Sequence, residues 1–136
     1  MAEIQLEDDH YCFACGSENK EGLCVEWIVE DKTTHTEFVA PRKFQGWKNI
    51  VHGGIIATLL DEAMTRLSWI VCGGALTAEM TVRFLKPALI GQKLFVFGRI
   101  VNENKKIVEM EAFIYKEKLN GTLIARSTGK AIKVKS

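Results

Sequence analysis

One long helical pattern constrains the fold of this chain more than any other feature. From Gly54 onward, apolar residues recur at steps of three and four, the spacing of an amphipathic helix with a wide buried face. Glycines at 73 and 74 are typical of a helix end. Such a helix runs roughly 27 Å and needs a sheet to cover its apolar face. Its apolar residues are Ile55, Ile56, Leu59, Leu60, Ala63, Met64, Leu67, Ile70 and Val71.

The rest of the chain shows the alternation of apolar and polar residues that is typical of strands. Before the helix, we predict an antiparallel hairpin with strands over 23–30 and 33–39. After it, we predict four strands, over about 78–84, 94–100, 108–115 and 122–134, with Asn120-Gly121 as the strongest hairpin signal. A single helix covers such a sheet only if the sheet curls around it. The expected fold class is α+β, with a curled antiparallel sheet of about five to six strands.

Length and composition indicate a single domain, residues 1–136, whose polar segment 1–22 is an N-terminal loop. A net charge of +1 favours neither nucleic acid nor an anionic membrane as a partner. We find no signal peptide and no apolar run that could span a bilayer, so we expect a cytoplasmic protein. Bulky residues on the second sheet face favour oligomerisation. They are Phe95, Phe97, Phe113 and Tyr115.

The helix begins at His52-Gly53-Gly54 without the usual Ser, Thr or Asp cap, so its first N–H groups lack an obvious internal partner. Glycines and the helix dipole make this a place for an anion or a developing oxyanion, although a turn that needs glycine is the alternative. Asp61 lies nine residues after His52, roughly 13 Å along the axis and half a turn out of phase. A second copy of the helix could place its Asp61 near the first copy's Gly54; a surface carboxylate is the other interpretation.

The four cysteines fit reduced thiols, and Cys12 and Cys15 form a C-x-x-C pair. A structural zinc site usually needs four ligands, for which only His10 and Cys24 are loose candidates. We therefore favour a structural turn at this pair. The three histidines show no metal-ligand spacing, so we expect no metal and no cofactor.

The order of elements, with His52-Gly53-Gly54 at the helix start and Asp61 nine residues on, resembles the hotdog-fold acyl-CoA thioesterases, most closely the phenylacetate-type (PaaI-like) branch. The resemblance covers about residues 12–134. It extends beyond the helix to four segments that look like the corresponding segments of family members, residues 12–16, 22–23, 44–47 and 77–87. It implies a homodimer whose sheets join edge to edge, often paired again into a tetramer. It also implies active sites at the subunit boundary and acyl-CoA as the substrate.

The resemblance further implies residue roles. The Gly54 amide would polarise the thioester carbonyl, and Asp61 of the neighbouring subunit would act as general base or nucleophile. Thr77 would hold the water, and His52 would support the loop. We prefer Asp61 to its neighbour Glu62, because Glu62 lies beside the apolar arc, where a salt bridge to Arg66 is the simpler interpretation.

Several substrate contacts remain open at this point. Some relatives carry Asn or Gln where this chain has Gly46, and either Gln45 or Asn49 could substitute. Gly53, Glu62, Met64, Trp69 and Arg83 are further candidates for lining the site. The cations that could hold the CoA phosphates are Arg83, Lys86, Arg126 and Lys130. The sequence does not identify the acyl group.

Two other functions are compatible with the same fold. One is a hotdog module that binds acyl-CoA without hydrolysing it, which loss of the carboxylate would favour. The other is a hydratase or dehydratase, which uses a catalytic His with a carboxylate on the helix. Because Asp61 is present and His52 precedes Gly-Gly, we favour the thioesterase.

Overall fold

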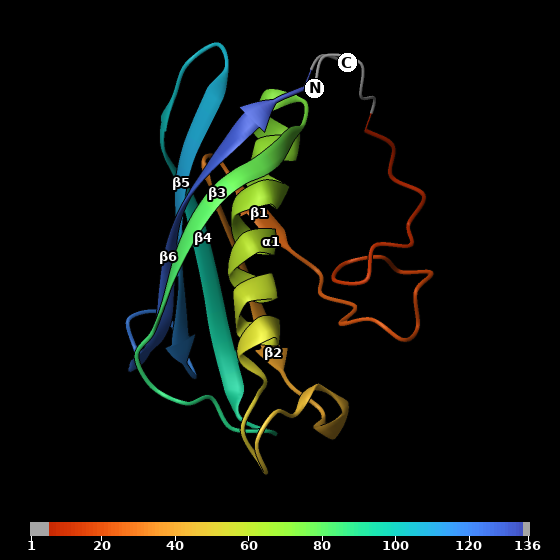
Figure 1. Cartoon of the computed structure of the whole chain (residues 1–136), viewed down its shortest axis with the longest axis vertical. Helices are drawn as coiled ribbons and strands as arrows, with labels where there is room; N and C mark the ends of the chain where they lie inside the picture. The colour runs from red at the N-terminus through yellow and green to blue at the C-terminus, as the bar shows by residue number, and fades with distance from the viewer. Residues whose placement is uncertain (1–5, 135–136) are drawn as a thin grey trace.

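The computed structural model of the chain describes residues 6–134, and these form one long helix on a six-stranded antiparallel sheet. The helix is α1 (Gly53–Cys72), preceded by a short 3-10 helix, η1 (Arg42–Phe44). The strands are β1 (Ile28–Glu30), β2 (Thr33–Val39), β3 (Ala75–Phe84), β4 (Lys93–Glu103), β5 (Ile107–Lys116) and β6 (Leu123–Lys133). Their order in the sheet is β1-β2-β4-β5-β6-β3. The sheet curls around α1 without closing, and the N-terminal segment lies on the other side of the helix (Figure 1).

The core forms where the apolar face of α1 meets the concave face of the sheet. Leu59, Leu60 and Leu67 are fully buried, as the helical pattern predicts. The alternating apolar residues of β4 and β5 are buried against them, Leu94, Val96, Val108, Met110, Ala112 and Ile114. Gly98 allows β4 to approach α1 closely, because a Cβ at this position would lie 2.7 Å from the carbonyl oxygen of Ala63.

The helix begins and ends almost where predicted. It starts one residue earlier, at Gly53, and it ends in Gly73, whose φ of 79° is the left-handed conformation that glycine adopts without strain. One predicted core residue differs, since Ile70 in the last turns is 52% exposed. No helix in the described part of the chain is both long enough and apolar enough to span a membrane.

The first predicted strand is shorter than its alternation suggested. Only Ile28–Glu30 pair with β2. The backbone N–H groups of Leu23 and Val25 instead donate to the carbonyls of Phe13 and Ala14, at 2.8 and 3.0 Å. The backbone N–H groups of Leu23 and Val25 therefore bind the N-terminal segment, whereas the Glu26 carbonyl accepts from the Thr36 hydroxyl of β2.

Two local irregularities also depart from the predicted pattern. A register shift between Thr77 and Glu79 in β3 leaves Ala78 exposed rather than on the buried face. Asn120-Gly121 does not form a two-residue hairpin, because only Asn120 has a positive φ and a type I′ turn needs two such residues. Glu117 also has a positive φ, and a longer loop connects β5 to β6.

Candidate active site

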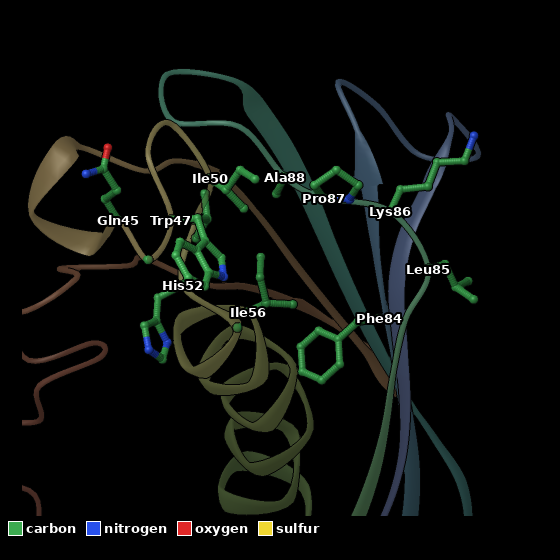
Figure 2. A pocket seen from close by; sticks show the side chains of 13 residues that line it. Gln45, Trp47, Ile50, His52, Ile56, Phe84, Leu85, Lys86, Pro87 and Ala88 are labelled. Atoms are coloured by element: carbon green, nitrogen blue, oxygen red, sulfur yellow. The ribbon is translucent and has the colours of Figure 1, made fainter.

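Two loops surround the start of α1 and form a pocket there. The Val51 N–H donates to the Ala88 carbonyl at 2.9 Å, which holds the loop before the helix against the segment after β3. The His52 N–H donates to the Phe44 carbonyl at the same distance and ties the end of that loop to its beginning. The pocket encloses about 920 Å³. Figure 2 shows its walls; they include Trp47, Ile50, Ile56, Phe84, Leu85 and Pro87.

Exposed aromatic side chains that are not among the predicted site residues line this pocket. Trp47 is 84% exposed and Phe84 is 58% exposed. Phe84 is the last residue of the predicted strand, and its ring stands over the helix start, 3.6 Å from where a Cβ of Gly53 would lie. Large exposed apolar groups around a cavity indicate a surface that binds an apolar ligand or a partner.

The side chain of His52 caps the helix. Its Nδ1 accepts a hydrogen bond from the Gly54 N–H at 2.8 Å, so the prediction that this amide lacks an internal partner is wrong. Histidine is not among the favoured cap residues, and for that reason the sequence did not reveal this bond. Both groups are solvent-exposed, so another acceptor can reach the amide if the imidazole turns away.

The structure distinguishes between the two amide residues near Gly46. Gln45 lines the pocket, whereas Asn49 does not. The side-chain oxygen of Gln45 accepts from the Asn49 N–H at 2.9 Å and thereby closes the loop. Asn49 has a φ of 65°, which Asn tolerates better than most residues, and this supports a role in the turn.

Asp61 contacts the hydroxyl of Thr77 near the middle of α1. The Thr77 hydroxyl donates to Asp61 Oδ1 at 2.8 Å. Asp61 is half-buried and Thr77 is exposed. The two predicted site residues therefore come together within one chain. Neither lines the pocket at the helix start, because seven residues of helix separate Asp61 from Gly54 by about 10 Å.

The Asp61–Thr77 pair lies beside a free sheet edge. Among the described strands, β3 pairs only with β6, which leaves its other edge unpaired over ten residues. Unpaired N–H and C=O groups on an edge of this length are a template for pairing with another strand.

Glu62 does not form the predicted salt bridge to Arg66. Instead its Oε1 accepts from Cys12 Sγ at 3.8 Å. Burial raises the pKa of the Glu62 carboxyl, and burial together with the charge of Glu62 raises the pKa of the Cys15 thiol. The side chain thus faces the N-terminal segment and not the pocket at the helix start.

The structure separates the remaining candidates from that pocket. Met64 is 1% exposed and accepts a hydrogen bond from Ser127 in the core, so it does not line the pocket. Trp69 lines a different cavity, together with Glu62. Arg83 points to the sheet face opposite Phe84, because adjacent strand residues alternate. Of the four candidate cations, only Lys86 is at the pocket, and Figure 2 shows its side chain extending outward.

A single helix within a curled antiparallel sheet is the arrangement known as the hotdog fold. The family model of the thioesterase superfamily matches residues 48–122, more than half of the chain. The chain therefore belongs to the thioesterase superfamily, the thioester hydrolases that the sequence predicted. A sequence comparison with curated proteins finds no significant match.

Solved structures share this fold at low identity. Zebra fish thioesterase superfamily member 2 is 18% identical with a TM-score of 0.77, and the alignment covers 91% of this chain and 92% of that one. PaaI, from the phenylacetic acid degradation operon of E. coli, is 19% identical with a TM-score of 0.74 over 81% and 83% of the two chains. The predicted fold is confirmed, and PaaI, which gives the predicted branch its name, has the same fold.

A hypothetical thioesterase from Streptococcus pneumoniae, solved with coenzyme A, is 19% identical with a TM-score of 0.72 over 79% of this chain and 86% of that one. Two mutant structures of a hypothetical thioesterase from the same organism replace an aspartate and a threonine by alanine, at positions 16 residues apart. Asp61 and Thr77 have the same separation here.

Proposed function

We propose that this thioesterase hydrolyses acyl-CoA to a carboxylic acid and free CoA, with Asp61 as the base or nucleophile. The observation that carries this proposal is the 2.8 Å hydrogen bond from Thr77 to Asp61. It holds a half-buried carboxylate at a defined place on the central helix and leaves the second carboxylate oxygen, Oδ2, available. The equal spacing of the aspartate and threonine altered in the Streptococcus pneumoniae mutants supports this assignment.

The Gly54 N–H supplies the second part of the proposed site. It lies at the N-terminus of α1, where the helix dipole favours negative charge. A thioester oxygen takes the place of His52 Nδ1 as the acceptor, so His52 holds the amide until substrate arrives. A fixed donor at the developing oxyanion is worth roughly 3 kcal/mol in a water-excluded site.

The proposed site is assembled from two subunits. Pairing of β3 with β3 of a second copy, around a two-fold axis, extends the sheet and sets the two α1 helices side by side and antiparallel. An axis beside Ala57 and Thr58, midway between Gly54 and Asp61 in the sequence, places each Asp61 opposite the partner copy's Gly54. The pocket walls and the carboxylate then face one another.

Hydrolysis in this arrangement needs a water molecule and no further reactant. Asp61 takes a proton from the water as its oxygen attacks the thioester carbon. The oxyanion of the tetrahedral intermediate accepts from the Gly54 N–H. The carbon–sulfur bond then breaks, and the departing thiolate takes up the proton that Asp61 removed from the water. If Asp61 instead acts as nucleophile, its oxygen attacks the carbonyl carbon, the carbon–sulfur bond breaks to release CoA thiolate, and water hydrolyses the resulting anhydride to the carboxylic acid and free Asp61.

The coenzyme A bound to the Streptococcus pneumoniae protein supports CoA as the carrier of the acyl group. In this chain, Lys86 at the pocket mouth is the cation best placed for a CoA phosphate. The apolar walls formed by Trp47, Ile56 and Phe84 suit the acyl group or an aromatic acid.

The test is a thiol-trapping assay of the purified protein with aryl, short-, medium- and long-chain acyl-CoAs. We expect Asp61→Asn to lower kcat by roughly 10²–10⁴-fold, because it keeps the shape of the side chain and removes the base. Asp31→Asn is the matched control, since Asp31 lies in the β1–β2 turn with a positive φ that Asn tolerates. Acyl-CoA binding without any turnover would instead identify a binding module. Full activity of Asp61→Asn would mean that another group is the base.

A further inference from the structure

Cys12, Cys15 and Glu62 form a cluster that the proposed hydrolysis does not use. One ligand atom from each, the two Sγ atoms and a carboxylate oxygen, lie within 4.8 Å of one another. All three side chains are half-buried. Glu62 comes from α1, 50 residues after Cys12, so the cluster depends on the tertiary fold and the sequence did not reveal it.

Backbone hydrogen bonds shape the turn that holds the two sulfurs. The Gly16 N–H donates to the Cys12 carbonyl at 2.8 Å, and the Ala14 N–H donates to Cys12 Sγ at 3.4 Å. Gly16 is required there, because a Cβ would lie 2.4 Å from the Cys12 nitrogen. The C-x-x-C segment is therefore a compact turn with both thiols directed at the same carboxylate.

The spacing of these atoms is close to that of a tetrahedral metal site. Zn–S bonds of 2.3 Å place two sulfurs about 3.8 Å apart, and a Zn–O bond of about 2.0 Å places oxygen about 3.5 Å from sulfur. The observed distance from Cys12 Sγ to Glu62 Oε1 is 3.8 Å. Small side-chain rotations would bring the three atoms into this geometry.

The donor set selects a class of metal. Two thiolates favour a borderline or soft ion such as Zn²⁺ over Mg²⁺ or Ca²⁺, which prefer oxygen ligands. Among the residues that the structure describes, no Lys, Arg or His lies within 4.0 Å of the Glu62 carboxylate as an ion pair, although Arg66 lines the same cavity and its charge acts to lower the pKa of the Glu62 carboxyl. A cavity of about 340 Å³ opens onto the three side chains and gives an ion and a water access.

We propose that Cys12, Cys15 and Glu62 bind one Zn²⁺ per chain, with water as the fourth ligand. The ion joins the N-terminal segment to α1, at the residue next to Asp61. The ion ties a segment with little regular secondary structure to the central helix, and its water ligand distinguishes it from the usual structural site with four protein ligands.

The test uses the full, untagged chain, reduced and freed of metal, and measures binding of Zn²⁺ by competition with a chromogenic chelator. We expect one Zn²⁺ per chain. Co²⁺ in its place should give the sulfur-to-metal charge-transfer absorption and the visible bands of a tetrahedral thiolate site. Zinc should raise the Tm by roughly 5 °C or more at saturating concentration.

Variants make the assignment specific. Cys12→Ser or Cys15→Ser should abolish stoichiometric binding, and Glu62→Gln should weaken it about tenfold or more. Cys24→Ser is the matched control and should leave binding unchanged, because Cys24 is exposed and donates to the Asn19 carbonyl, outside the cluster. The proposal is overturned if the reduced chain binds less than half an equivalent of Zn²⁺. Equal loss in Cys24→Ser, or unchanged affinity in Glu62→Gln, would also overturn it.

Discussion

The Thr77 hydroxyl orients Asp61, and its contribution can be measured separately from that of the carboxylate. Thr77→Val keeps the shape of the side chain and removes the donor to Asp61 Oδ1. A net hydrogen bond to a charged group contributes about 1.5–3 kcal/mol, so we expect kcat to fall about 10- to 100-fold with little change in KM. The measurement is steady-state kinetics with the best acyl-CoA from the panel.

Thr77→Ser is the control for that prediction, because serine retains the hydroxyl. Activity close to that of the unaltered chain is expected. A serine variant as inactive as the valine variant would show that the methyl group of Thr77, rather than its hydrogen bond, is what matters.

Lys86 offers a second test at the scale of one residue. It lines the pocket mouth, whereas Lys130 lies on β6 in register with Glu79 of β3 and Glu109 of β5. Lys86→Gln should raise KM for acyl-CoA about fivefold, equivalent to ~1 kcal/mol, and leave kcat unchanged. Lys130→Gln should change neither. The effect should shrink at high salt, and a salt-independent change would exclude a role in phosphate binding.

At the scale of elements, the contact between β4 and α1 depends on a single glycine. Gly98→Ala would place a methyl group 2.7 Å from the Ala63 carbonyl oxygen, which belongs to the helix backbone and cannot move aside easily. We expect a loss of about 1–3 kcal/mol in the free energy of unfolding, measured by urea denaturation.

Gly53→Ala is the glycine-to-alanine control for the β4 prediction. Its Cβ would meet only Phe84, at an ordinary contact distance of 3.6 Å. Its free energy of unfolding should stay within about 0.5 kcal/mol of the unaltered chain. Equal stability of Gly98→Ala would show that strand and helix can separate without cost.

At the scale of the whole molecule, the decisive question is whether one chain or two form the active site. Asp61→Asn lacks the proposed base, and Gly54→Pro lacks the proposed amide donor, which in this structure bonds the His52 side chain. Each variant should be inactive alone. If the site is shared, a mixed dimer restores one of its two sites, so an equal mixture should recover about a quarter of the activity after random exchange.

An intact site within each chain would give no recovery in that mixture, since every chain carries one defect. Sedimentation analysis of each variant checks that both still form dimers. A monomer with full activity would contradict the two-subunit proposal altogether.

Much of the fold follows from periodicity. The helix, its end at Gly73 and the buried faces of β4 and β5 were predictable, because each depends on regular spacing along the chain. The extent of β1 was not predictable. Its apparent continuation bonds the N-terminal segment, and a local pattern does not reveal a partner that is distant in the sequence.

The candidate site also has a part that could be predicted from the sequence and a part that could not. The sequence alone indicated the residues for which we propose the chemistry: the helix start through its residue types and spacing, and Asp61 through the resemblance to the family. Only the tertiary structure decided their partners. It paired Asp61 with Thr77, Gly54 with His52, and Glu62 with the cysteines in place of Arg66. Side chains from distant segments meet only when the sheet curls around the helix. The spacing of residues along the chain does not predict these contacts, because the partners lie far apart in the sequence.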